Sequence, residues 1–226
     1  MASVQSSNAG RHARASLMDI YKAERSWDGW NSDAVAIAND LINQLLQAHN
    51  AQEPAVWHPS IQPYFPDLPE KYLSSALATA KEKLQQLEHK MSMMVRQVER
   101  IEAAANLLVG IGSGVSGNDE PLVLDSVSRY GDLGLRVAGA YRRAVDERER
   151  HLVEIRNAIE ELEHPGSMDS VKAVLLDSDE QLVKLSSWLH SPGLKDALLF
   201  EAPASSTLMV SDFDEMLRVE LGIEEI

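Results

Sequence analysis

The chain has 226 residues, a formal net charge of −14 at pH 7 and no cysteine. The lack of cysteine excludes disulfide bonds, thiolate zinc sites and a cysteine nucleophile. An acidic surface repels phosphate, so direct nucleic-acid binding and binding to anionic membranes are both disfavoured. No apolar run reaches the roughly 18 residues that a membrane span requires, so we expect no membrane-spanning helix.

Residues 1–15 are rich in serine and alanine, and we expect them to form a disordered tail. Short helices are predicted over residues 16–53, with Asn31, Ser32 and Asp33 supplying capping side chains for the second of them. Its apolar stripe is wide, which is typical of a helix packed against two neighbours. The spacing of Arg11, Arg14 and Ser16 also matches a weak pattern for basophilic kinases.

Residues 54–69 contain five prolines, together with Trp57, Tyr64 and Phe65. Proline at this density prevents a continuous helix. We interpret the segment as an extended strap whose aromatic side chains pack onto the helices. The alternative is a polyproline ligand, because Pro63 and Pro66 have PxxP spacing.

Residues 70–164 carry two series of apolar positions in 4-3 spacing, which predict a coiled-coil hairpin with a loop at residues 110–121. In the antiparallel register that we expect, Ile101 faces Gly131 and Val98 faces Gly134. The glycines would admit a neighbouring backbone, either from the N-terminal helix or from a partner. A parallel homodimer is the structural alternative. The first series comprises Leu73, Leu77, Ala80, Leu84, Leu87, Met91, Met94, Val98, Ile101, Ala105 and Leu108.

The second series, from Leu124 to Leu162, places Arg148 at a d position, where a buried charge is costly unless it is paired. We expect this side chain to reach out of the seam and bind Glu88. A role in fixing the register is the alternative.

Residues 165–204 are predicted to form short helices, and residues 205–226 an acidic amphipathic tail motif. Phe213, Met216 and Leu217 fall on one side of a helix, among several acidic residues. The motif either binds a partner protein through a basic-rimmed groove or folds back on the chain, and the sequence leaves both open.

The glycine-rich segment Gly110–Gly117 contains the pattern G-x-G-x-x-G. A dinucleotide site needs that pattern between a strand and a helix, whereas a heptad helix precedes it here. A nucleotide-binding module therefore remains only a minor alternative, and we expect no catalytic residue, cofactor or metal.

The sequence thus predicts an all-α, elongated protein: a long antiparallel coiled-coil helical hairpin with short flanking N- and C-terminal helices. We expect a non-catalytic structural or adaptor subunit of a heteromeric complex of kinetochore, cytoskeletal, tethering or transcription-regulatory type, in nucleus or cytoplasm. The alternative is a self-sufficient homodimeric coiled coil. Helix–helix packing with other protein subunits is predicted to involve Met94, Val98, Ile101, Gly131, Gly134, Tyr141, Phe213, Met216 and Leu217.

Overall fold

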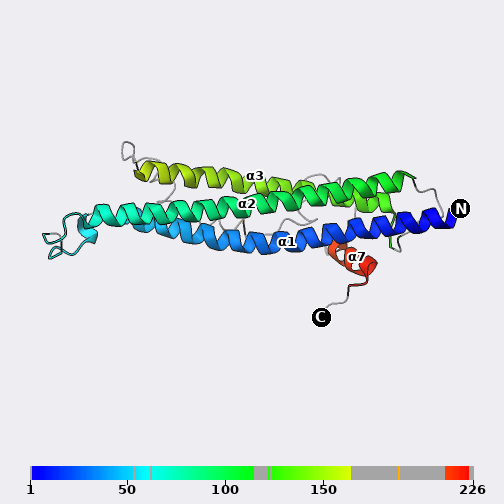
Figure 1. Cartoon of the computed structure of the whole chain (residues 1–226), viewed down its shortest axis with the longest axis horizontal. Coiled ribbons are helices and arrows are strands. Elements are labelled where there is room, and N and C mark those ends of the chain that lie inside the picture. The colour runs from blue at the N-terminus through cyan, green and yellow to red at the C-terminus, as the bar shows by residue number, and fades with distance from the viewer. Residues whose placement is uncertain are drawn as a thin grey trace, which may run out of the picture. The chain divides into compact units, whose positions relative to one another are not determined.

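The computed structural model describes residues 2–52, 54–61, 63–114, 122, 124–163, 188 and 212–223. Every regular element in these ranges is helical, which confirms the all-α class (Figure 1). Apart from Trp188, the short helices expected at 165–204 lie outside the described residues. The elements are α1 (Ala2–Asn50), the 3-10 helix η1 (Pro54–Val56), α2 (Leu68–Gly114), α3 (Val127–Glu163) and α7 (Asp212–Leu221).

The described residues pack into two units, and each long helix contributes one part to each unit. Unit 1 comprises the described residues of 1–29, 93–145 and 191–226, and unit 2 those of 30–92 and 146–190. In unit 1, α7 lies beside α1 (Figure 1). No described helix combines the length and the apolarity that crossing a membrane requires.

Helix α1 replaces both the disordered tail and the pair of short helices that we expected. It runs through 49 residues without a break. The side chains expected to cap a second helix are used elsewhere: Asp33 pairs with Lys90 at 2.8 Å, and Asn31 is buried. Ser16, in the kinase-like pattern, is buried within α1 and is not accessible to a kinase in this structure.

The heptad positions within α2 and α3 are buried except Leu73, and Leu124, the first position of the second series, lies before α3 and is exposed. In unit 2, Lys81 pairs with Glu163 and Glu88 with Arg156, both at 2.5 Å. Residue numbers rise along α2 as they fall along α3, so the two helices are antiparallel in this unit.

The expected register of these two helices is wrong by about two helical turns. A β-carbon placed on Gly131 would lie 2.6 Å from Cγ2 of Val109, and one on Gly134 would lie 2.8 Å from Cβ of Ala105. Ile101 is therefore not the residue opposite Gly131. The close backbone comes from α2 of this same chain, and the β-carbon placed on Gly134 would also lie 3.2 Å from Cδ1 of Ile20 in α1.

The register error follows from the end of α2. We expected the loop to begin at residue 110, whereas α2 continues to Gly114. A β-carbon on Gly112 would lie 2.7 Å from the backbone nitrogen of Ser128, so this glycine permits close packing at the start of α3. Residues 110–114 of the glycine-rich segment are helical, which differs from the tight turn of a dinucleotide fingerprint.

Candidate partner-binding site

The connection between α1 and α2 exposes a group of large apolar side chains in unit 2. Val56 is 56% exposed, Ile61 41%, Tyr64 78% and Phe65 62%. We call these four residues the connection patch. The expectation that Tyr64 and Phe65 pack onto the helices is therefore wrong, because both rings face solvent.

The backbone of the connection folds into successive turns rather than an extended strap. The amides of Tyr64 and Phe65 both donate to the carbonyl of Ile61 at 3.0 Å, and the amide of Leu68 donates to Phe65 at 3.2 Å. A polyproline helix has no internal hydrogen bonds, so this conformation differs from a PxxP ligand. The prolines of the connection also fix backbone dihedral angles within these turns.

Trp57 holds the connection against the ends of the two helices. Its indole Nε1–H donates to the carbonyl of Ala51 at 2.7 Å. The indole ring also meets the ring of Tyr72, in α2, edge to face at 5.9 Å. Because Trp57 is tied to both helices, the patch beside it is carried by an ordered set of turns rather than by a free loop.

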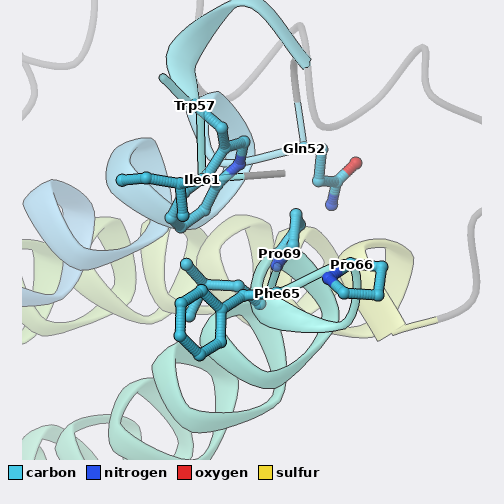
Figure 2. Close-up of a pocket in the computed structure, with 7 residues that line it drawn as sticks. Gln52, Trp57, Ile61, Phe65, Pro66 and Pro69 are labelled. Carbon is cyan, nitrogen blue, oxygen red and sulfur yellow. The ribbon is translucent and has the colours of Figure 1, made fainter. Parts of the chain in front are cut away.

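A pocket of about 310 Å³ opens beside the patch, and Figure 2 shows its lining side chains gathered around it. Two residues of the patch, Ile61 and Phe65, line the pocket. Its wall is mostly apolar, as is common in sites that receive an apolar side chain. The lining residues are Gln52, Trp57, Ile61, Phe65, Pro66, Leu68 and Pro69.

The nine residues predicted to bind partners all lie in unit 1, so the structure does bring them together. Eight of them are buried within the unit, and Met216 is partly buried. As folded, these side chains pack against the chain's own helices and do not form an open surface. The sequence pattern found them because a buried seam and a binding seam have the same periodicity.

Helix α7 is folded back onto the other helices of unit 1, as in the second alternative for the acidic motif. Phe213 and Leu217 are buried, and the Phe213 ring lies 6.5 Å from the ring of Tyr130 in α3. A carboxylate oxygen of Glu220 accepts a hydrogen bond from the amide of Leu124 at 3.1 Å. These contacts fix one face of α7 on the chain.

Acidic groups gather where α7 meets α1. The pKa of Glu24 is raised to about 8, mainly by burial and in smaller part by the nearby Asp214 and Asp28, while Arg25 acts against them. Burial also raises the pKa of Tyr141, whose ring meets Trp27 edge to face at 4.7 Å.

A second buried polar cluster lies in unit 2. Arg148 is only 2% exposed and donates to the side-chain oxygen of Asn31 and to the backbone carbonyl of Trp188. The predicted bond to Glu88 is wrong, because Glu88 binds Arg156 instead. The Trp188 ring also meets His151 edge to face at 5.4 Å. The cluster joins α1 to α3 and to Trp188 in the interior of unit 2, and we therefore assign it a role in packing.

Sequence reasoning missed the connection patch as a surface, although a signal was present. Its large apolar side chains stand outside both heptad series and among prolines, where no periodic helix face could cover them. Comparison of the sequence with profiles of known protein families and with curated proteins gave no match.

Proposed function

We propose that the chain is a non-catalytic helical subunit of a multiprotein complex and that it binds a protein partner through the connection patch. The single observation that carries this proposal is that Ile61 and Phe65 are exposed at an apolar pocket, in a short connection that also exposes Val56 and Tyr64. Large exposed apolar side chains around an apolar pocket are typical of interaction sites.

The chemistry of the patch suits a protein surface. Tyrosine and phenylalanine supply large contact areas while losing little side-chain entropy on binding, and aromatic residues are enriched at the centres of interfaces. The turns that carry them are already tied to α1 and α2 through Trp57. A partner would therefore meet a largely ordered surface, which lowers the entropy lost on association.

The net charge of −14 supports a partner other than a second copy of the chain. Two copies would repel each other, whereas a neutral or basic protein would not. We therefore infer a partner that offers an apolar side chain to the pocket and carries basic residues around it.

The burial of the heptad positions within the units supports a binding site outside the seam. In a seam-mediated homodimer, these side chains would have to meet a second chain, and here the chain's own helices cover them. The alternative is a homodimer formed through the connection patch. It predicts that the molar mass measured by light scattering rises from that of one chain to that of two as the protein concentration increases.

Site-specific photocrosslinking tests the proposal. A photoreactive phenylalanine analogue is placed at Tyr64, and at Leu107 as the control, because Leu107 is 62% exposed on α2 but lies outside the patch. We expect the Tyr64 probe, in cells that make this chain, to crosslink one defined protein that the Leu107 probe does not. That protein, once purified, should bind the wild-type chain at least tenfold more tightly than a Tyr64→Ser/Phe65→Ser variant.

Two results would contradict the proposal. One is a Tyr64 probe that crosslinks nothing above the level of the Leu107 probe. The other is a Tyr64 crosslink found only to a second copy of the chain, accompanied by a dimer that the double substitution abolishes.

A further inference from the structure

Helix α7 is held on unit 1 by one narrow face. Phe213, Leu217 and Glu220 are buried, and these positions recur along one side of a helix. Val219, on the opposite side, is 58% exposed. The residues that receive α7 are Arg25 in α1, Tyr130 in α3 and the amide of Leu124, and we call these three the α7 seat.

The ion pair between α7 and α1 adds little to this attachment. Asp214 lies 3.6 Å from Arg25, and both side chains are about half exposed. An exposed pair of this kind contributes only about 0–1 kcal/mol. Asp214 also pairs with Arg218 of its own helix at 2.9 Å, so the contact with Arg25 is shared.

Like charges weaken the same contact. Glu24 in α1 lies close enough to Asp214, and to its own neighbour Asp28, for each pair of acids to repel when ionised. The Arg25 guanidinium is the opposing charge on α1, and Tyr141 faces the same group from α3. Charges at this edge therefore add little net attraction between α7 and α1, and the two apolar anchors of α7 provide most of the attachment.

A helix as short as α7 depends on its seat for its own folding. It has 10 residues, and isolated helices of fewer than about 12–15 residues are marginal in water. Its end is well defined: Gly222 has a φ of 66°, and the amides of Gly222 and Ile223 bond to the carbonyls of Val219 and Arg218. The segment is thus a compact helical ligand carried on the same chain.

We propose that α7 is a replaceable occupant of its seat, and that unit 1 binds an acidic amphipathic helix of a partner protein when α7 is displaced. The inference concerns unit 1 and goes beyond the role of the connection patch in unit 2. Occupation by α7 blocks the seat, and a partner helix competes with it by mass action.

The contacts of α7 define the chemistry of that partner helix. An aromatic residue followed four positions later by leucine would fill the places of Phe213 and Leu217. An acid one position after the aromatic residue would face Arg25, and a second acid at the position of Glu220 would accept from the Leu124 amide.

A labelled peptide of residues 212–223 is the probe, titrated by fluorescence anisotropy against three full-length proteins. The first is the wild type, the second carries Phe213→Ser and Leu217→Ser, and the third carries the control Val219→Ser. We expect the double variant to bind the peptide at least tenfold more tightly than the wild type, because its own α7 no longer fills the seat. The control should match the wild type.

The same peptide carrying Asp214→Asn and Glu220→Gln tests the acidic requirement, and we expect its affinity for the double variant to fall several-fold. Hydrogen exchange gives a second measurement that needs no variant. In the wild type, amides of α7 should exchange at least a hundredfold faster than those of residues 13–27 in α1, and excess peptide should speed them further.

Three results would overturn the proposal. The first is a double variant that keeps its helical circular dichroism but binds the peptide no more tightly than the wild type. The second is loss of most helical signal in that variant, or α7 amides that exchange together with α1, since either makes α7 part of the cooperative fold. The third is a double variant that dimerises without binding peptide.

Discussion

Arg148 and Asn31 lie 117 positions apart in the sequence, yet Nη2 and Nε of Arg148 donate to the same side-chain oxygen of Asn31 at 3.0 and 3.2 Å. The Asn31 amide in turn donates to the carbonyl of Trp188 at 2.6 Å, and Arg148 reaches that carbonyl at 2.9 Å. Burial lowers the pKa of Arg148 to about 10, so the side chain stays charged at neutral pH. The buried guanidinium of Arg148 thus joins α3 to α1 through its hydrogen bonds to Asn31.

The first prediction is that Arg148→Met destabilises unit 2 by about 2–4 kcal/mol, because the side-chain oxygen of Asn31 then loses its donors inside the core. Urea denaturation followed by circular dichroism measures the change. Arg150→Met is the matched control: Arg150 is exposed on α3, away from the core face, and its loss should change stability by less than about 0.5 kcal/mol.

A double substitution separates the charge from the packing. Arg148→Met/Asn31→Leu removes both polar partners, so we expect it to be less destabilising than the sum of the single changes by at least about 1 kcal/mol. Strict additivity of the two single changes would contradict the coupling inferred from the hydrogen bonds.

Arg148 also illustrates the limit of sequence reasoning for this fold. The heptad pattern correctly placed it on the buried face, because periodicity is a local property of one helix. Its partner was predicted from the α2–α3 alignment alone and was therefore wrong, since Asn31 arrives from α1. Asn31 itself resembled a helix cap, and only the three-helix packing gives it another role.

The heptad seam shows the same contrast: burial was predicted correctly from local periodicity, whereas the register between helices was not. Nearly all heptad positions of α2 and α3 are buried as the 4-3 spacing predicts. The register depends on where α2 ends. A glycine-rich sequence predicts a loop, but here Gly112 lies within α2 and permits its close contact with Ser128. The connection patch escaped prediction for a related reason: composition alone does not tell whether an aromatic side chain among prolines packs or protrudes.

The second prediction uses the glycines of α3. In a helix, Gly→Ala alone stabilises by about 1 kcal/mol. A β-carbon on Gly131 would lie 2.7 Å from the backbone nitrogen of Val109, and backbone cannot move aside easily, so we expect Gly131→Ala to destabilise by about 1–3 kcal/mol. Thermal and urea unfolding show whether the substitution raises or lowers the free energy of unfolding.

Gly139 is the matched control on the same helix. A β-carbon placed on Gly139 would have the end of the Arg143 side chain as its nearest neighbour, at 3.7 Å, which is an ordinary contact. Gly139→Ala should therefore stabilise by about 0.5–1 kcal/mol. If both substitutions stabilised the protein, the close packing of α3 on α2 would be wrong.

The third prediction concerns the buried seam in unit 1. Ile101 is fully buried, and Ile101→Asp would place a carboxylate in the core, with an expected cost of several kcal/mol. Helical circular dichroism and the unfolding midpoint should both fall sharply. Leu107→Asp, at an exposed position of the same helix, should leave both nearly unchanged, and similar losses in the two variants would contradict the assigned faces of α2.

The fourth prediction is a pH dependence that originates at Glu24. Its pKa in the folded chain is about 8, against an ordinary value of 4.5, so the folded state holds this proton more tightly than the unfolded state does. The associated stability is fully present below about pH 4.5 and is lost as pH rises towards 8. Burial is the largest cause of the raised pKa; Asp214 in α7 and Asp28 in α1 add to it, and Arg25 opposes it.

Glu24→Gln mimics the protonated side chain at every pH, so it should remove this dependence. We expect the variant to be more stable than the wild type, by a margin that grows between about pH 4.5 and pH 8 and is constant above that range. Urea unfolding at pH 5, 6, 7, 8 and 9 measures it. Glu99→Gln, at an exposed position of α2, should shift stability equally at each pH. A margin for Glu24→Gln that did not grow with pH would mean that this carboxyl is solvated and that its proximity to Asp214 does not oppose the docking of α7.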